Sequence, residues 1–327
     1  MAQQKIWAYF LYLSRHMWLD ETSKRPSWTL QPPYNYPYKE ENETDVAVWD
    51  ETIAYLAKTQ YNMVVIDIGD GMKFERHPEI SAPDAWDKDF LKKKLDEMRA
   101  LGLEPIPKLN FSTGHDTWLK IYRRMISTPQ YYEVCRDCIE EVCEVFGNPR
   151  FFHLGLDEED YDHQKLHDMA IIRSQELWWH DAYYLFDIVE KRGIRPWIWG
   201  DCNWYHPEAF AEKMPRHILV SNWFYATLMD YPAGSINENR LAGYEKLEKL
   251  GFDQVPGVST WYNNTNALET MLYAEKIMSP EHIAGYMTIP WFHTIRENQY
   301  TLLNDAYQFF RARRTVYPDS LKPNDIE

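Results

Sequence analysis

The sequence lacks several features that mark particular classes of protein. It has 4 cysteines in 327 residues and no apolar run of the about 18 residues that a membrane-spanning helix needs. Its longest basic run, residues 92–94, has the pattern of one helix face. The formal net charge is −15, from 50 acidic and 35 basic residues, whereas nucleic-acid-binding domains carry a basic surface. We therefore expect neither a nucleic acid nor a membrane as a partner.

Cofactor and metal motifs are missing as well. No G-x-G-x-x-G follows a β-like segment, and the chain contains no H-x-H or H-E-x-x-H pair. Cys135 and Cys138 form a C-x-x-C, but the segment is helical in pattern and has neither a second pair nor a nearby His. We expect buried thiols, no cofactor and no metal. The opening residues MAQQKIWAYF carry no signal-peptide pattern, which leaves cytoplasmic and exported locations open.

Aromatic residues, by contrast, are abundant. They make up 16% of the chain, with 14 Trp and 23 Tyr. Aromatic rings combine flat apolar faces with polar edges, which suits stacking against sugar rings. A Trp-rich core accounts for the same composition, and composition alone does not separate the two explanations.

The dominant pattern along the chain is an alternation of short apolar runs and amphipathic helices. Eight β-like runs occur, at residues 5–14, 62–71, 104–113, 150–159, 195–204, 217–226, 253–262 and 283–292. Helical patterns lie between most of them, at residues 46–60, 87–102, 128–147, 174–193, 238–251 and 267–278. Near-continuous apolar strands that alternate with helices are typical of parallel sheets covered on both faces. We predict an α/β fold, a (β/α)₈ TIM barrel formed by residues 1–327 as one domain, with a doubly wound sheet as the alternative.

The barrel prediction gathers the polar strand ends at one rim. Active sites of this fold lie at the C-terminal ends of the strands. The side chains expected there include several carboxylates, an Arg, three His and at least five Trp: Arg15, His16, Asp67, Asp70, Asn110, His115, Asp157, Glu158, Trp199, Asp201, Trp204, Asn222, Trp223, Tyr225, Trp261, Tyr262, Asn264, Trp291 and His293. Carboxylates beside aromatic walls are typical of glycoside hydrolysis, which commonly uses two acidic groups.

The segment FFHLGLDEED, residues 151–160, places four acidic residues at the end of one such strand. Adjacent side chains of an extended segment point to opposite sides, so Asp157 and Glu158 do not suit the usual pairing of an acid with a nucleophile. Substrate-assisted hydrolysis avoids this difficulty, because the nucleophile is the 2-acetamido oxygen of the substrate. We expect Glu159 and Asp160 to be loop residues or a helix cap.

Six segments resemble motifs of the glycoside hydrolase family 20 β-N-acetylhexosaminidases. HLGLDEED resembles the H-x-G-G-D-E motif of that family, and IPKLNFSTGH resembles its I-P-E-x-D-x-P-G-H. YLSRHMW, IDIGDG with HPEIS, WIWGD and WYNN are similar to further strand-end motifs, in the family's order. The resemblance extends over residues 5–295 and covers the catalytic barrel only.

The resemblance implies roles for individual residues. Glu158 corresponds to the general acid/base, Asp157 to the carboxylate that holds the acetamido N–H, and Tyr262 to the donor for the acetamido oxygen. The implied substrate is a β-linked amino-sugar glycan or glycoconjugate, cleaved with retention from its end. The remaining implied substrate-binding residues are Arg15, Asp70, His115, Trp199, Asp201, Trp223, Asn264, Trp291 and His293; of these, the three Trp would wall the acetamido pocket and His115 would support the acid.

The sequence departs from the family pattern at the residues that would recognise sugar hydroxyls. Leu156 replaces the second Gly before the acidic pair, and Lys108 and Asn110 replace acidic residues. Tyr12, Asp67, Asn264 and His293 are further departures. These changes predict altered sugar or linkage preference with the chemistry retained. His163, His167 and His180 lie in helical segments, and we expect them to be surface or packing residues.

Two other functions fit the same rim. A metal-dependent hydrolase or isomerase would use residues such as Asp67, His115, Asp157 and His293 as ligands. A non-catalytic sugar-binding barrel would bind glycans without turnover. The structural explanation for Asp157 and Glu158 is a helix cap or a surface pair of acids.

Overall fold

The computed structural model of the chain describes residues 4–17, 38–165, 167–173, 175–227 and 233–323. Eight parallel strands occur in these residues, in the sheet order β6-β5-β4-β3-β2-β1-β8-β7. They are β1 Ile6–Tyr12, β2 Met63–Asp67, β3 Glu104–Lys108, β4 Phe151–His153, β5 Arg195–Trp199, β6 Leu219–Ser221, β7 Gly257–Val258 and β8 Gly285–Thr288. Parallel bridges from Val220 to Gln254 and from Trp223 to Gly257 join the β6 and β7 segments and close the barrel.

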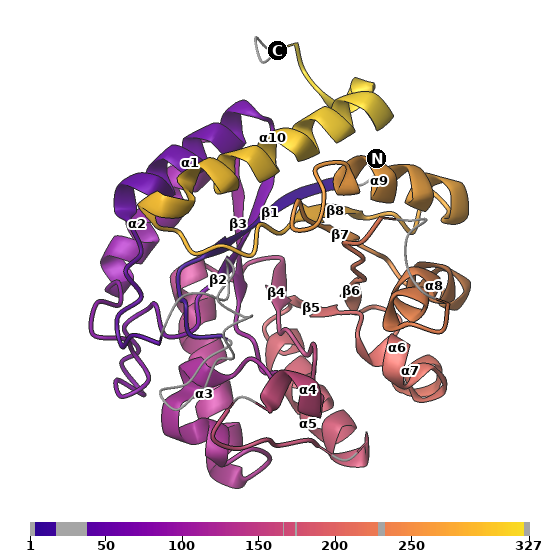
Figure 1. Cartoon of the computed structure of the whole chain (residues 1–327). Helices are drawn as coiled ribbons and strands as arrows, with labels where there is room; N and C mark the ends of the chain where they lie inside the picture. The colour runs from indigo at the N-terminus through magenta and orange to yellow at the C-terminus, as the bar shows by residue number, and fades with distance from the viewer. Residues whose placement is uncertain (1–3, 18–37, 166, 174, 228–232, 324–327) are drawn as a thin grey trace.

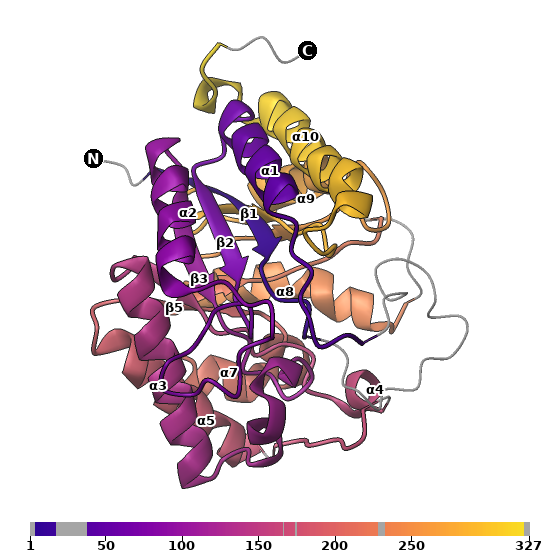
Figure 2. The same cartoon turned by 90° about the vertical axis from the view of Figure 1, so that its left-hand side faces the viewer.

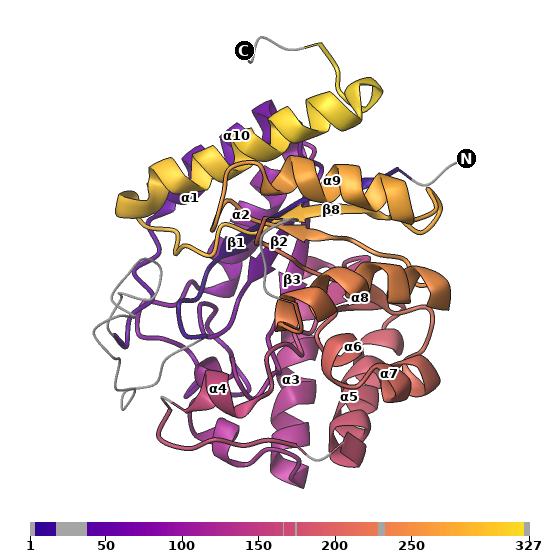
Figure 3. The same ribbon diagram turned by 45° about the vertical axis from the view of Figure 1, so that its right-hand side comes forward.

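Helices surround the strands on the outside (Figures 1–3). They are α1 Val46–Lys58, α2 Lys88–Ala100, α3 Pro129–Phe146, α4 Tyr161–Gln164, α5 Gln175–Glu190, α6 Cys202–Tyr205, α7 Pro207–Lys213, α8 Ile236–Leu250, α9 Asn266–Ile277 and α10 Gln299–Val316, with short 3₁₀ turns at Thr117–Arg124, Arg296–Asn298 and Pro318–Ser320. The C-terminal α10 lies against α1 and α9 and so joins the two ends of the helical ring (Figure 1). The predicted (β/α)₈ TIM barrel is confirmed. None of the described helices is both long and apolar enough to cross a membrane.

Local sequence explains the helix boundaries. The carboxylate of Asp45 accepts from Ala47 and Val48 N–H at the start of α1, and Asp87 accepts from Phe90 N–H at the start of α2. At the far end of α3, Gly147 has φ 70°, a left-handed conformation that glycine adopts without steric cost. The four cysteines are buried free thiols, as expected.

The strands separate two apolar layers. Along β1, Tyr9 and Leu11 face the helices, whereas Ala8 and Phe10 face the barrel interior, as the period of two in a strand requires. All seven residues of β1 are buried. This two-sided burial explains why the apolar runs are almost continuous in sequence.

Several strands are shorter than the apolar runs predicted. β5 ends at Trp199, and the chain then turns, with Asn203 N donating to the Gly200 carbonyl at 3.0 Å and Trp204 N to the Asp201 carbonyl at 2.8 Å. The residues beyond the last ladder bond therefore belong to rim loops and short helices. These rim residues are apolar, like the strands, because many of them are buried.

A buried ion pair lies inside the barrel. The Lys108 Nζ is 2.6 Å from Asp67 Oδ2, and both side chains are at most 5% exposed. The ammonium also lies over the Phe10 ring, 5.1 Å from its centroid. Burial raises the pKa of Asp67, and Lys108 opposes that rise. The two departures from the family pattern at these positions thus pair with each other.

Lys108→Met should therefore destabilise the fold strongly. It leaves Asp67 buried without its cation, which costs about 3–5 kcal/mol of unfolding free energy. Without Lys108 the folded-state pKa of Asp67 rises further above its unfolded value. The loss of unfolding free energy is therefore largest above that raised pKa and shrinks as the pH falls through it. Denaturant unfolding of Lys108→Met, Asp67→Leu and the double variant checks this. The double variant should regain most of the unfolding free energy that the single variants lose. If the losses of the two single variants add in the double variant, the pairing is contradicted.

Candidate active site

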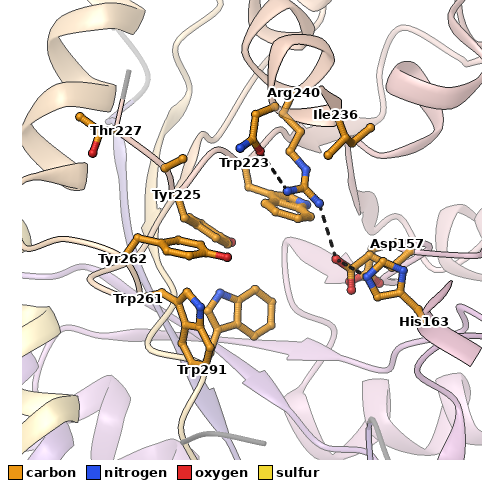
Figure 4. A pocket seen from close by; sticks show the side chains of 13 residues that line it. Asp157, His163, Trp223, Tyr225, Thr227, Ile236, Arg240, Trp261, Tyr262 and Trp291 are labelled. Carbon is orange, nitrogen blue, oxygen red and sulfur yellow. Dashed lines mark hydrogen bonds and ion pairs between the residues drawn. The ribbon is translucent and has the colours of Figure 1, made fainter. Parts of the chain in front are cut away.

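A cavity of about 620 Å³ opens at the C-terminal ends of the strands (Figure 4). It combines two carboxylates, two basic side chains and an aromatic wall. The lining residues are Asp157, Glu158, His163, Trp223, Tyr225, Ala226, Thr227, Ile236, Asn237, Arg240, Trp261, Tyr262 and Trp291. This is the rim at which the sequence predicted a site.

The backbone after β4 turns sharply to present the acidic pair. Gly155, Leu156 and Glu158 have φ values of 74°, 67° and 50°. A Cβ at Gly155 would lie 1.9 Å from Asn110 Oδ1, so only glycine fits there. Left-handed φ costs a non-glycine residue about 1–2 kcal/mol, but the Leu156 side chain is 3% exposed, and such burial returns about 1.5–3 kcal/mol. The Leu156 side chain packs in the apolar layer between the strands and the helices.

Asp157 is held firmly in place. It is 4% exposed, and its Oδ1 accepts a hydrogen bond from Asn110 Nδ2 at 2.9 Å. The Nε2 of His115 is 3.5 Å from its Oδ2, and the Ser112 hydroxyl donates to its carbonyl. Asn110, at a position where the family pattern has an acidic residue, thus orients the candidate acetamide-binding carboxylate.

Glu158 contacts a basic group at each carboxylate oxygen. Its Oε2 is 3.1 Å from His115 Nε2, and its Oε1 is 3.2 Å from His163 Nε2 and 4.0 Å from Arg240 Nη2. Burial alone would raise the pKa of Glu158, but the hydrogen bonds and charges of the two histidines hold it well below its usual range.

His163 lies at the surface, as expected, but it also has a place in the site that the sequence did not predict. It lies on α4 and lines the cavity. Asp160 caps α4 by accepting from His163 N at 3.0 Å, and both of its carboxylate oxygens are 2.9 Å from His163 Nδ1. Burial lowers the pKa of His163, but Asp160 and Glu158 together raise it to about 10. Asp160 is therefore the predicted helix cap, and it also orients the imidazole.

Asp201 places a buried carboxyl beside the pair. Its Oδ1 accepts from Glu158 N at 3.2 Å, and its Oδ2 accepts from Trp223 Nε1 at 3.0 Å. Burial raises the pKa of Asp201 well above its usual value, and the charges of Asp157 and Glu158 raise it further. Asp201 thereby fixes both the Glu158 backbone and an aromatic wall of the cavity.

Tyr225, Tyr262 and Trp291 lie across the cavity from Asp157 (Figure 4). Trp223 and Tyr225 stack with ring centroids 5.0 Å apart, and Trp291 meets Tyr225 edge-on at 6.2 Å. Tyr262 is 70% exposed, and its hydroxyl points into the cavity (Figure 4). Trp199 is buried behind Trp291, with centroids 6.1 Å apart, so it supports the wall from below.

Two predicted residues at the ends of β1 and β2 lie outside the cavity lining. The Arg15 Nη1 is 2.6 Å from Glu43 Oε2. Asp70 is fully buried and binds His16 Nδ1 at 2.6 Å and Lys120 Nζ at 2.5 Å. Asp70 therefore ties together the loops after β1, β2 and β3.

Two residues at the β7 and β8 ends also lie outside the lining. Asn264 accepts from Asn304 Nδ2 at 3.4 Å, on the side of α10. His293 is buried and meets the Tyr12 ring edge-on, with centroids 5.6 Å apart. The structure thus gathers Asp157, Glu158, Tyr262, Trp223 and Trp291 around one cavity, and places His115, Trp199 and Asp201 behind them.

The sequence reading assigned no role to Arg240, which comes from the first half of α8. Its guanidinium lies over the Trp223 ring at 4.0 Å and the Trp204 ring at 5.2 Å. One of many charged residues on an amphipathic helix carries no signal of its own. For His163 a signal existed, because Asp160 stands three residues before it and two residues after Glu158.

One group in the described chain has the donor set of a metal site. Ligand atoms of His115, Asp157 and Glu158 all lie within 4.8 Å of one another. Imidazole with two carboxylates suits a divalent transition metal. The same three residues also form the hydrogen-bonded network described above, which needs no ion to hold it together.

The barrel is similar to those of several β-N-acetylhexosaminidases. The enzyme of Bacteroides fragilis NCTC 9343 matches with a TM-score of 0.59 and 12% identity over 98% of this chain and 72% of its own. The family 20 enzyme of Streptomyces coelicolor A3(2) matches with a TM-score of 0.59 and 12% identity over 94% of this chain and 64% of its own. Dispersin B matches with a TM-score of 0.59 and 14% identity over 95% of this chain and 98% of its own. At these identities the likeness shows a shared (β/α)₈ barrel fold. No protein-family model matches, and no curated protein matches in sequence.

The histidine contacts predict the effect of His163→Asn on Glu158. Loss of an imidazolium 3.2 Å away should raise the pKa of Glu158 by about 1–3 units. The measurement is a ¹³C NMR titration of labelled glutamate carboxyls, with Glu158 assigned by Glu158→Gln. His180→Asn, on the exposed face of α5, is the matched control and should leave the midpoint unchanged. An unchanged midpoint in His163→Asn would refute the proposed ion pair.

Proposed function

We propose that the protein is a retaining, exo-acting β-N-acetylhexosaminidase that uses the 2-acetamido group of its substrate as the nucleophile. The observation that carries this proposal is the geometry after β4, where adjacent Asp157 and Glu158 both line one aromatic cavity. Two carboxylates on adjacent residues serve different atoms of one substrate better than they serve as an acid and a nucleophile. The shared barrel fold with β-N-acetylhexosaminidases supports the same conclusion.

In this mechanism Asp157 acts on the acetamide. Its carboxylate accepts the acetamido N–H and stabilises the positive charge as the acetamido oxygen attacks the anomeric carbon. Asn110 and His115 hold the carboxylate in that orientation. Tyr262 donates to the acetamido oxygen from across the cavity, and Trp223 and Trp291 exclude water around the methyl group.

Glu158 transfers the proton. It protonates the leaving oxygen as the glycosidic bond breaks, and then removes a proton from the water that opens the oxazolinium ring. The histidines favour its ionised form. The fraction of Glu158 that carries a proton therefore falls as the pH rises, and turnover should fall with it. The product keeps the β configuration because the anomeric carbon is inverted twice.

The hydroxyl-recognition residues differ from the family pattern, so the preferred sugar or linkage differs too. Arg15, Asn264 and His293 remain proposed contacts for the non-reducing end of the sugar. Asp70 is proposed to support that end through His16 rather than by direct contact. We also infer that the barrel acts as one catalytic domain over residues 1–327.

A non-catalytic sugar-binding barrel is the second candidate. The low pKa of Glu158 favours it, because an acid that stays ionised does not donate a proton. It predicts glycan binding without turnover, and binding that Glu158→Gln leaves unchanged.

A panel of aryl β-glycosides with and without the 2-acetamido group tests the proposal. Only the acetamido sugars should be hydrolysed, because the others lack the nucleophile. Glu158→Gln should lower kcat/KM by about 10²–10⁴-fold, most for poor leaving groups, and Asp157→Asn should lower it comparably. Asp162→Asn, at an exposed position on α4, is the control and should retain full activity.

Three outcomes would reject parts of the proposal. Equal turnover of plain β-glucosides would exclude the substrate-assisted mechanism. Activity lost on chelation and restored by a divalent metal would favour metal-dependent hydrolysis at His115, Asp157 and Glu158. Binding of acetamido sugars with no turnover would favour the non-catalytic barrel.

A further inference from the structure

Arg240 lines the cavity, and few of its N–H donors form hydrogen bonds. Its Nη1 donates to Asn237 Oδ1 at 3.3 Å, and its Nη2 is 4.0 Å from Glu158 Oε1, which is longer than a hydrogen bond. Its Nε is buried and has no partner in the described chain. A guanidinium carries five N–H donors, so most of this group's hydrogen-bonding capacity is unfilled.

Arg173, an arginine with a buried side chain, has a purely structural set of contacts. Arg173 binds both carboxylate oxygens of Glu159, contacts Asp181 at 3.1 Å and donates to the Phe111 carbonyl at 3.3 Å. It does not line the 620 Å³ cavity, whereas Arg240 does. The difference suggests that the remaining donors of Arg240 serve a ligand.

The position of Arg240 assigns it to one side of the substrate. Figure 4 shows Tyr262, Tyr225 and Trp291 on one side of the cavity, with His163 on the other. Arg240 lies over Trp223, between these two groups, and its Nη2 faces the same oxygen of Glu158 as His163 does. If the acetamido sugar packs on the aromatic side and Glu158 protonates the glycosidic oxygen, the basic side faces the leaving group.

We propose that Arg240 and His163 form an anion-binding subsite for the leaving group. The preferred substrates are then β-N-acetylhexosaminides attached to an acidic sugar that bears a carboxylate or a sulfate ester. This inference rests on the proposed function and names its substrate class. The planar donor fork of Arg240, held flat by Trp223, suits two-point binding of either anion.

Such a ligand would also prepare the acid for reaction. An anion bound by Arg240 and His163 competes with Glu158 for the same two cations, so Glu158 takes up a proton more readily. Several elements bring ionisable groups close to Glu158. They are His115, Asp157, Asp160, His163, Asp201, Tyr205, Tyr225 and Arg240. Binding of the correct leaving group would thereby favour the protonated, reactive form.

Matched disaccharides test the subsite. One carries β-linked N-acetylglucosamine on glucuronate, and the other carries it on the methyl ester of the same sugar, which removes only the charge. Wild-type kcat/KM should favour the glucuronate by about 10- to 100-fold, and Arg240→Gln should abolish most of that ratio. Arg311→Gln is the matched control, because Arg311 also binds an amide three residues earlier at 3.3 Å and lies over an aromatic ring, but outside the cavity. It should keep the full ratio.

Equilibrium binding separates this inference from the proposed function. Calorimetry in the Glu158→Gln background should show tighter binding of the glucuronate disaccharide than of its ester, and Arg240→Gln should remove the difference. Selective binding with no wild-type turnover would refute the proposed function and keep the subsite. Turnover of both disaccharides at equal kcat/KM, or a ratio that survives Arg240→Gln, would overturn the subsite and keep the function. A sulfated analogue run beside them tells which anion binds better.

Discussion

The site depends on the turn that follows β4. In an extended strand Asp157 and Glu158 would point to opposite faces, and only one of them could reach the cavity. The left-handed backbone at Leu156 and Glu158 removes that restriction, so both side chains line the same space. Close contact between Gly155 and Asn110 holds the turn in place, and Asn110 in turn holds Asp157. Backbone strain of this kind persists where the surrounding packing supports it, as the buried Leu156 does here.

Asp157 and Asp201 are buried at one rim with the partly buried Glu158, and the basic groups that compensate their charge come from several segments. His115 from the loop after β3 and His163 from α4 bind Glu158, while burial raises the pKa of Asp201 after β5. Below the rim, Lys108 and Asp67 form a second compensated pair. The same balance that keeps the carboxyls in place sets the protonation state of Glu158, which links the stability of the site to its chemistry.

The barrel and the place of the site follow from patterns that a sequence carries directly. Alternating apolar runs and helices indicate the fold, and the strand ends indicate the rim. Arg240 could not be assigned in this way, because its role depends on how α8 is oriented toward Glu158. For His163 the Asp160 cap was visible in the sequence, but the contact with Glu158 depends on the orientation of α4. The Lys108–Asp67 pair was likewise visible only as two separate departures from a family pattern. Asn264 and Arg15 stay predictions, since the described structure gives them other neighbours and does not bring them to the cavity lining.

The central claim is that this cavity stabilises the oxazolinium formed by the substrate's own acetamide. A stable bicyclic thiazoline, in which sulfur replaces the oxygen of that ring, tests it most directly by calorimetric titration. The account predicts binding at least about 100-fold tighter than that of the parent N-acetyl sugar, as expected for an analogue of a reaction intermediate, with most of the gain lost in Asp157→Asn. Thiazoline affinity no better than that of the sugar, or unaffected by Asp157→Asn, would contradict it.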